Sequence, residues 1–261
     1  MGYFTLKSIF VSLILLFTSA VFSQNLRPLS PDRPHQTESS VTTDKGHFML
    51  EADFLNYRKE TTDGLTSNAT GVFYFNAKYG FHKNMDIEVL SGTFTQLHFP
   101  SSLLSDKKTF FDDFLFRYKL NLIGNDSGSI SVALMPFVST SNMFREKFVV
   151  NDFGFLLNLD KQLSERCGIG YTGGLSSFSL DGKNNYELFS TASFDYQVTG
   201  NLHHFVEGSY RYNESAAYLH TYSFDSGLTF TPRQNLQFDC GFYYFFPVNT
   251  LFAFVGGSIR L

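Results

Sequence analysis

The chain has 261 residues, of which 18% are aromatic, with 32 phenylalanines, 14 tyrosines and no tryptophan. The mean hydropathy of −0.09 argues against a protein built from membrane-spanning helices, since each such helix needs about 20 apolar residues. The net charge of −4, without a basic run, argues against nucleic-acid binding.

Residues 1–23 have the features of a secretory signal peptide. Lys7 supplies the positive start, residues 9–17 form a short apolar run, and Val21-Phe22-Ser23 precedes the expected cleavage before Gln24. The apolar run is short for a membrane anchor, which needs about 20 residues. We therefore predict an exported protein with a cleaved signal peptide.

Residues 24–45 are polar and contain Pro28, Pro31 and Pro34. They show neither a helical nor a strand period, so we predict an extended N-terminal segment.

From residue 46 to the end, apolar and polar residues alternate in long runs. Between 236 and 246, for example, the even-numbered residues are apolar or aromatic, whereas the odd-numbered ones include Gln237 and Asp239. Side chains alternate across a strand, so this pattern predicts strands with one apolar and one mixed face. We predict about twelve strands, near 46–58, 69–81, 85–97, 109–122, 129–141, 148–160, 165–179, 185–198, 201–213, 218–231, 235–246 and 251–261.

The connections alternate between short turns and longer loops. The turns fall at 81–84, 124–128, 162–165, 199–200 and 232–234, and the loops at 59–68, 100–108, 142–147, 181–184 and 214–217. Most predicted strands exceed the roughly 9–11 residues that cross a membrane, whereas strands of a soluble sandwich usually run about 5–6. We therefore predict that residues 46–261 form an all-β, transmembrane, antiparallel up-and-down barrel. Closure would also leave no edge on the apolar last strand.

In such a barrel the apolar faces contact lipid and the polar faces line the lumen. An Arg or Lys facing mid-depth lipid would cost about 2–4 kcal/mol. The predicted outward residues are Phe73, Phe75, Ala77, Tyr79, Ile87, Val89, Phe114, Phe116, Tyr118, Leu120, Phe153, Phe155, Leu157, Leu159, Leu188, Ala192, Phe194 and Tyr196. The predicted inward residues are Glu51, Asp53, Asn76, Lys78, Asp86, Glu88, Asp113, Arg117, Lys119, Asp152, Asn158, Glu187, Asp195, Glu207, Arg211, Asp225, Asp239 and Arg260.

The stretch from Asp32 to Ser39, Asp-Arg-Pro-His-Gln-Thr-Glu-Ser, is followed by Lys45-Gly46 and Met49-Leu50-Glu51. This pattern resembles the N-terminal signature of the outer-membrane transporter family named after a phenol-degradation (MetA) pathway. His35 stands where an acidic residue is common in that signature. The resemblance implies an outer-membrane barrel that passes small, often hydrophobic molecules, with outer-membrane lipid and the barrel-assembly machinery as partners. The cleavage region resembles that of exported proteins of Bacteroidetes, which are Gram-negative.

The N-terminal segment has two possible placements. It could be a periplasmic tether, or it could fold into the lumen as a plug. Charge complementarity and the resemblance favour the plug, in which Arg33 could bind Glu51, Asp53 or Asp239 through a bidentate contact. The plug and lumen candidates are Asp32, Arg33, Pro34, Glu38, Glu51, Asp53, Lys78, Glu88, Asp113, Arg117, Lys119, Glu207, Arg211, Asp239 and Arg260.

We predict a porin-like channel that passively passes a small, hydrophobic or aromatic solute. Two alternatives remain open, a barrel lipid hydrolase and a closed structural barrel. A hydrolase would pair a serine with a histidine. His98 and His220 lie near predicted outer ends, but Ser223 falls on the opposite face from His220, and no Gly-x-Ser-x-Gly motif is present. Metal-ligand spacings, phosphate loops and dinucleotide fingerprints are also missing from the sequence, so we expect neither a cofactor nor an enzyme.

Overall fold

The computed structural model describes residues 26–62, 65–98, 107–140, 150–180, 183–214 and 220–261. The predicted signal peptide, 1–23, lies outside these residues, as do most of the loops predicted at 100–108, 142–147 and 214–217. No helix in the described part of the chain is long and apolar enough to cross a membrane.

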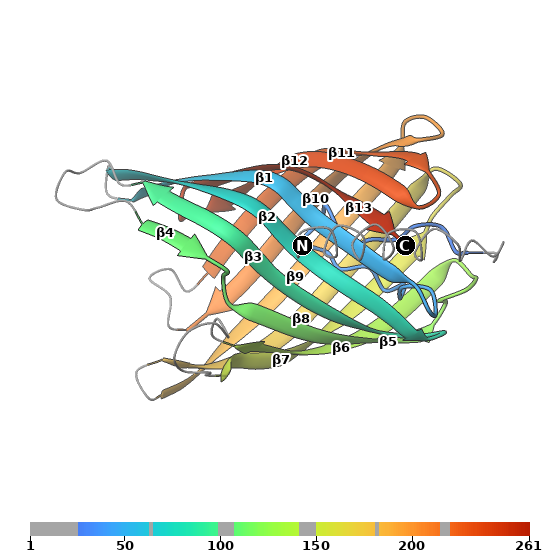
Figure 1. The fold of residues 1–261 in the computed structure, drawn as a ribbon, viewed down its shortest axis with the longest axis horizontal. Coiled ribbons are helices and arrows are strands. Elements are labelled where there is room, and N and C mark those ends of the chain that lie inside the picture. The colour runs from blue at the N-terminus through green and yellow to red at the C-terminus, as the bar shows by residue number, and fades with distance from the viewer. Residues whose placement is uncertain (1–25, 63–64, 99–106, 141–149, 181–182, 215–219) are drawn as a thin grey trace, which may run out of the picture.

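The described strands form one antiparallel sheet that closes into a barrel (Figure 1). The strands follow one another around the ring in chain order and each pairs with the next, except that β4 and β5 both pair with the same side of β3. These two strands share one position, so the ring has twelve positions. The prediction of an up-and-down barrel of about twelve strands is confirmed. The strands are β1 (Phe48–Thr62), β2 (Leu65–His82), β3 (Met85–His98), β4 (Lys107–Phe110), β5 (Phe114–Ile123), β6 (Ile130–Thr140), β7 (Val150–Gln162), β8 (Cys167–Leu180), β9 (Lys183–Gln197), β10 (Leu202–Asn213), β11 (His220–Arg233), β12 (Leu236–Phe246) and β13 (Thr250–Arg260).

The barrel closes between its first and last strands. β1 pairs with β2 on one side and with β13 on the other. At the end of this seam, Phe48 N donates to Leu261 O at 3.1 Å and Leu261 N donates to Phe48 O at 2.8 Å. The apolar last strand is therefore paired along both sides, which removes the aggregation-prone edge of an open sheet.

Apolar side chains cover the outside of the barrel and charged ones fill the inside. Phe153 is 60% exposed and Phe224 49%, whereas Lys78 is 2% exposed and Glu51 is fully buried. A soluble protein shows the reverse distribution, while a lipid-embedded barrel requires this one. Phe114, which we predicted to face lipid, is an exception. It is buried, and its ring stacks on that of Phe116 with 6.4 Å between centroids.

The strands β1 and β2 extend beyond their predicted ends. Residues 59–62 and 65–68, predicted as loop, belong to the two strands, so the prediction of a long loop at 59–68 is wrong. Apart from Leu65 these residues are polar, but strand pairing depends on backbone hydrogen bonds and continues past the apolar band. Thr61 and Thr66 pair across the two strands through their hydroxyls at 3.1 Å.

The predicted strand 109–122 is broken at residues 111–113, where Phe111 has a φ of +54°. The break shifts the alternation by one residue. Asp112, rather than Asp113, therefore lines a cavity in the lumen. Asp113, which we predicted to face inward, is exposed and accepts a hydrogen bond from Asn151 Nδ2 at 2.7 Å.

Irregularities at the same level occur in the neighbouring strands. The pairing of β1 with β13 shifts between Asp53 and Leu55, and Phe73 of β2 has a φ of +54°. Each extra residue reverses which positions face the lumen, as expected for a β-bulge. Asn56 and Arg58 therefore follow Glu51 and Asp53 around the same cavity.

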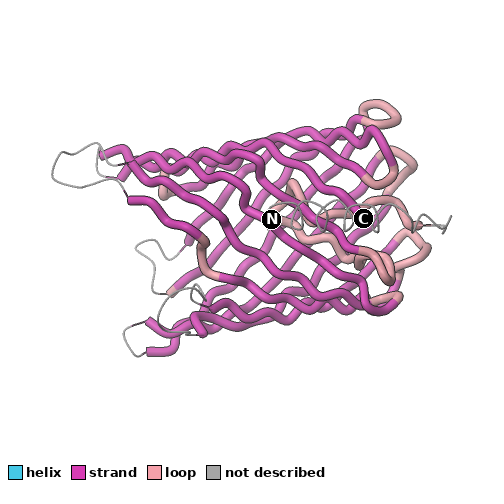
Figure 2. The backbone as a smooth tube through the Cα atoms, viewed as in Figure 1, coloured by secondary structure: helices cyan, strands magenta, loops and turns pink. Residues whose placement is uncertain are grey.

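The two ends of the barrel differ. One end, here the turn end, carries short connections at 83–84, 124–129, 163–166, 198–201 and 234–235. The other, the loop end, carries the remaining connections, most of which lie outside the described residues. Figure 2 shows most of the described loops at the turn end, together with a strand-free stretch inside the ring of strands. That stretch is the N-terminal segment.

Candidate functional site in the barrel lumen

The N-terminal segment, residues 26–45, enters the lumen at the turn end and returns to it (Figures 1 and 2). Its two ends meet there, because Arg27 Nε donates to Asp44 Oδ1 at 2.9 Å. Arg260 Nη1 donates to Asp44 Oδ2 and to the Arg27 carbonyl, both at 2.8 Å. The residues between these ends are carried towards the middle of the barrel.

Asp32 lies at the centre of a buried cluster of charges. Its carboxylate is 2.5 Å from Lys78 Nζ and 2.7 Å from Lys119 Nζ. Lys78 also contacts Glu51 at 2.5 Å, and Lys119 contacts Glu88 at 3.2 Å. Burial alone would raise the pKa of Asp32, but the two ammonium groups hold it well below its usual range. Asp32 is therefore ionised and supplies a charge that both lysines require.

Arg33 connects the segment to strands β1 and β12. Its Nη2 is 2.5 Å from Asp239 Oδ1 and its Nε donates to Asp239 Oδ2 at 3.3 Å, while Nη1 pairs with Asp53. The guanidinium also stacks over Phe254, 5.3 Å from the ring centroid. A Cβ added at Gly256 would lie only 2.3 Å from Arg33 Nη2, so this glycine leaves the space that the arginine fills.

Glu38 connects the segment to strands β5 and β8. Its Oε1 is 2.7 Å from Arg117 Nη1, and its backbone N donates to Thr172 Oγ1 at 2.9 Å. Burial raises the pKa of Glu38 to about 8, against the opposing effect of Arg117. The same guanidinium lies 3.8 Å from Glu88, so two carboxyl groups face one arginine.

Carboxylates of the barrel wall also bind the backbone of the segment. Glu207 accepts hydrogen bonds from the N–H groups of Gln36 at 2.8 Å and Thr37 at 2.6 Å, and Asp160 accepts one from Ser40 at 2.7 Å. An extended chain leaves its amides unpaired, and buried amides require acceptors. Glu51 likewise accepts hydrogen bonds from the N–H groups of Asp32 and Arg33, and Asp86 accepts one from the N–H of Thr43.

His35 faces the turn end and contacts strands β9 and β10. Its Nε2 is 2.9 Å from Asp195 Oδ1, and its ring meets the edge of Phe205 with 4.4 Å between centroids. Burial by itself would lower the pKa of His35, but the Asp195 carboxylate and the nearby Glu207 raise it overall. In the sequence, His35 stands out only as a departure from the family signature, and its contact with Asp195 is not predictable from that.

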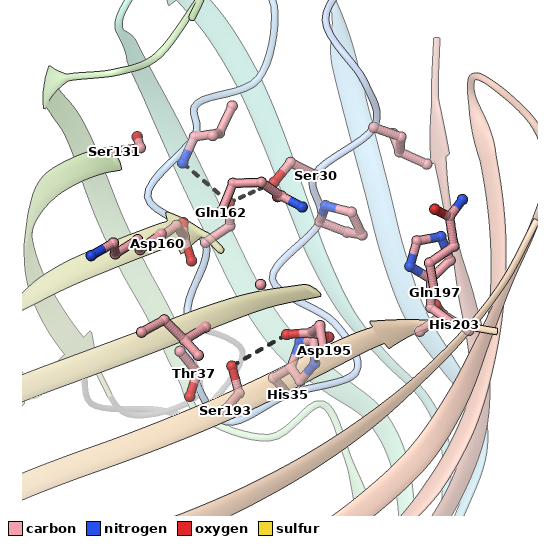
Figure 3. A pocket seen from close by; sticks show the side chains of 18 of the residues that line it. Ser30, His35, Thr37, Ser131, Asp160, Gln162, Ser193, Asp195, Gln197 and His203 are labelled. Atoms are coloured by element: carbon pink, nitrogen blue, oxygen red, sulfur yellow. Dashed lines mark hydrogen bonds and ion pairs between the residues drawn. The ribbon is translucent and has the colours of Figure 1, made fainter. Parts of the chain in front are cut away.

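Cavities lie on both sides of the segment. One of about 420 Å³ opens on the turn-end side, where Figure 3 shows His35, Thr37, Asp160 and Asp195 facing the same space. Two others, of about 600 and 260 Å³, lie among residues of the loop-end half. Arg33, Pro34 and His35 line both the first cavity and the largest of these three, so the segment forms the partition between the two.

Most of the predicted lumen residues contact the segment directly or through one further side chain. Pro34 contributes its carbonyl, which accepts a hydrogen bond from Tyr243 Oη. Arg211 is separate, because its side chain is 46% exposed and pairs with Glu187 at 3.0 Å, nearer the loop end. Asp113 is separate because of the break before β5. The residues brought together are Asp32, Arg33, Pro34, Glu38, Glu51, Asp53, Lys78, Glu88, Arg117, Lys119, Glu207, Asp239 and Arg260.

Ser223 and His220, which were considered for hydrolysis, do not form a nucleophile–base pair with each other. Ser223 Oγ is buried and accepts a hydrogen bond from Gln36 Nε2 at 2.8 Å, whereas His220 Nδ1 is 3.0 Å from Tyr210 Oη in an exposed position. Across the described ranges, histidine, cysteine, aspartate and glutamate side chains form no group that could hold a metal ion.

The model of the family described as "Putative MetA-pathway of phenol degradation" matches residues 31–261. The chain belongs to this family. The family resemblance seen in the sequence is thereby confirmed, and the matched range includes most of the N-terminal segment. No curated protein matches the sequence.

Solved structures with a fold similar to that of this member of the MetA-pathway family include an outer membrane channel, a porin and the translocator domain of an autotransporter. An outer membrane channel from Pseudomonas putida F1 superposes with a TM-score of 0.60 and 11% identity, covering 87% of this chain and 100% of that one. The NanC porin superposes with a TM-score of 0.56 and 10% identity, covering 79% of this chain and 100% of that one. The translocator domain of autotransporter NalP from Neisseria meningitidis superposes with a TM-score of 0.50 and 10% identity, covering 84% of this chain and 90% of that one. At these identities the likeness concerns the fold.

Proposed function

We propose that this barrel is an outer-membrane channel that passively passes a small solute, and that the N-terminal segment is its plug. The observation that carries the proposal is the partition of the lumen, in which residues 33–35 stand between cavities on the two sides. The apolar exterior, with Phe153 and Phe224 exposed, suits contact with outer-membrane lipid. Two similar structures carry the names channel and porin, which supports the same function.

The proposed orientation places the turn end in the periplasm. Short periplasmic turns and longer outer loops are usual for such barrels. The segment would then enter the lumen from the periplasm after removal of a signal peptide, and the barrel-assembly machinery would insert the folded chain. A Bacteroidetes-like, Gram-negative origin is part of the same proposal and depends on the cleavage-region resemblance alone.

The lining of the largest cavity supports a hydrophobic or aromatic solute. Tyr74, Phe94, Tyr243 and Phe252 line this space together with charged groups of the segment. Ligand sites commonly combine aromatic walls with a few polar groups that fix orientation. A solute of this kind would contact the plug directly.

Planar-bilayer recordings test the proposal. The mature chain is expected to stay mostly closed, whereas a chain without residues 24–45 is expected to show step-like conductance, because the two sides of the lumen become connected. Arg33→Ala is expected to give an intermediate, flickering conductance, since it releases Asp53 and Asp239 but leaves the other contacts.

Two outcomes would contradict the proposal. Silence in every variant, with the barrel folded as judged by its heat-dependent gel mobility, would support the closed structural barrel. Release of fatty acid from added phospholipid, without conductance, would support the hydrolase.

A further inference from the structure

Arg117 occupies the junction of the two loop-end cavities and lines both. Its contact with Glu38 uses Nη1 and a single carboxylate oxygen, at 2.7 Å. Within the described part of the chain, Arg117 Nε and Glu38 Oε2 are buried without a hydrogen-bond partner. Buried polar atoms are normally paired, and leaving them unpaired costs free energy. One edge of the guanidinium therefore still has the capacity to bind a carboxylate.

Apolar side chains lie next to this guanidinium. The cavity of about 260 Å³ is lined by Leu115, Phe137, Leu156 and Phe189 on its apolar sides. Its volume is below the range of about 300–1,000 Å³ that is typical of drug-sized ligands, which suits a molecule of one ring. A ligand matched to these walls has a flat apolar body and one anionic group.

A second ion pair also lines this cavity. Arg211 pairs with Glu187 at 3.0 Å, and its guanidinium lies 5.1 Å from the centroid of the Phe189 ring. This arginine has both a carboxylate and an aromatic face as partners. Arg117, with an unpaired buried Nε, is therefore the stronger candidate for a ligand's anionic group.

We propose that Arg117 binds the carboxylate of a small aromatic acid, which takes the place of Glu38 on the guanidinium while its ring packs in the apolar cavity. A carboxylate can accept from Nε and one Nη together, the two-point geometry that arginine favours. This inference rests on the proposed function in one respect. Glu38 belongs to the plug, so its displacement would release one side-chain tether of that plug.

The surroundings of Glu38 make this exchange favourable. Glu38 faces Arg117 and Lys119 of β5, Glu88 of β3, Thr172 of β8 and Asp32 of the segment. Burial and the neighbouring acids raise its pKa to about 8, so near pH 7 this carboxyl is largely protonated. An ionised aromatic acid would then compete with a largely neutral group for the arginine, and would place a full negative charge at the position that Glu38 occupies on Arg117.

Calorimetric titration of the mature chain in detergent micelles tests the binding step, with benzoate as the probe. Benzoate is expected to bind, and benzamide and acetate to bind about tenfold more weakly or less, since one lacks the charge and the other the ring. Arg117→Gln is expected to weaken benzoate binding by about 10- to 100-fold, and Arg117→Lys by less. Arg233→Gln, an exposed arginine outside the cavities, serves as the matched control.

The pH dependence provides a readout that a purely structural role would not change. Benzoate stays ionised between about pH 6.5 and 9, while Glu38 loses its proton and becomes a competitor. Affinity is therefore expected to fall over this range in the mature chain and to stay level in Glu38→Gln. Equal binding of benzoate and benzamide, or an unchanged affinity in Arg117→Gln, would overturn the proposal.

The two proposals can fail separately. Conductance that appears on deletion of residues 24–45, without Arg117-dependent benzoate binding to the mature chain, would retain the plug and overturn the aromatic-acid site. Arg117-dependent binding by a barrel that stays silent after the deletion would retain the site and overturn the channel. Benzoate is expected to increase brief openings of the mature chain only if both hold.

Discussion

Residues 32–33 of the N-terminal segment contact the barrel wall mainly through ion pairs, whereas residues 36, 37 and 40 contact it mainly through hydrogen bonds to wall carboxylates. On the side of β1, β2, β5 and β12, Asp32 and Arg33 form side-chain ion pairs with buried charges of the wall. On the side of β7 to β10, Glu207 and Asp160 accept hydrogen bonds from backbone amides, and also from the hydroxyls of Thr37 and Ser40. The ion pairs depend on residue identity in the segment, whereas the amide contacts depend on the wall.

Within this one segment, the ion pairs determine which residue docks at which position, and the amide contacts contribute mainly to the strength of docking. An ion pair fixes which residue stands opposite which, because a buried charge without its partner is costly. A carboxylate that binds backbone amides stabilises an extended chain of almost any sequence. The charged side therefore sets the register of the segment, and the amide side adds to the free energy of docking.

The largest effect is expected from Asp32→Ala, which leaves Lys78 and Lys119 without their shared carboxylate. Removing one partner from a buried ion pair typically costs about 3–5 kcal/mol. We expect the segment to undock, with step-like conductance and faster proteolysis within residues 26–45. Asp126→Ala is the matched control, because this aspartate is 70% exposed and lies 3.6 Å from Arg27. Equal behaviour of the two variants would show that the charge cluster does not set the register.

A smaller effect is expected from Glu207→Gln in the wall. The variant keeps the size of the side chain but replaces two ionised oxygens by one carbonyl and one amide, so at least one segment amide loses its acceptor. Hydrogen bonds to charged groups contribute about 1.5–3 kcal/mol each. We expect more frequent brief openings in bilayers without a change of the open-state conductance. Glu187→Gln is the control, because Glu187 pairs with Arg211 away from the segment.

The barrel could be predicted from the sequence because its signal is repeated in every strand. Alternation of period two, strand length and the two classes of connection all indicated the same architecture. The bulges could not be predicted, since one extra residue at Phe73 or Phe111 leaves the composition unchanged but reverses the alternation beyond it. The incorrect inward placement of Asp113 follows from this single shift.

The candidate site could be predicted only where both partners are side chains. Arg33 and three possible carboxylates are visible in the sequence, and the structure places Asp53 and Asp239 on its guanidinium. Contacts to backbone amides carry no residue signature in the segment. The signal present in the sequence was that acidic residues outnumber basic ones among the predicted inward positions. Some of these carboxylates therefore need partners other than basic side chains. His35 could be recognised only after Asp195 was placed beside it.

The smallest effect on docking of the segment, per pH unit, is expected from a change of pH. This change tests the titrating residues without altering the other contacts. His35 has a raised pKa, so its contribution to docking is complete below about 6.5 and is lost as pH rises through the raised value. Glu38 has a pKa raised to about 8, so its ionisation also disfavours docking as pH rises towards that value. Each group changes the docking free energy by at most about 1.4 kcal/mol per pH unit.

Both residues act in the same direction, so openings in bilayers should become more frequent from about pH 6.5 to 9. His35→Gln and Glu38→Gln should each flatten part of this rise, and the double variant should remove most of it. Asp32 acts in the opposite sense, because its lowered pKa stabilises docking throughout this range and is overcome only in strong acid. A rise that persists in the double variant would assign the titration to groups of the barrel wall. It would also mean that the ion pairs of Asp32 and Arg33 do not respond to the protonation of His35 and Glu38.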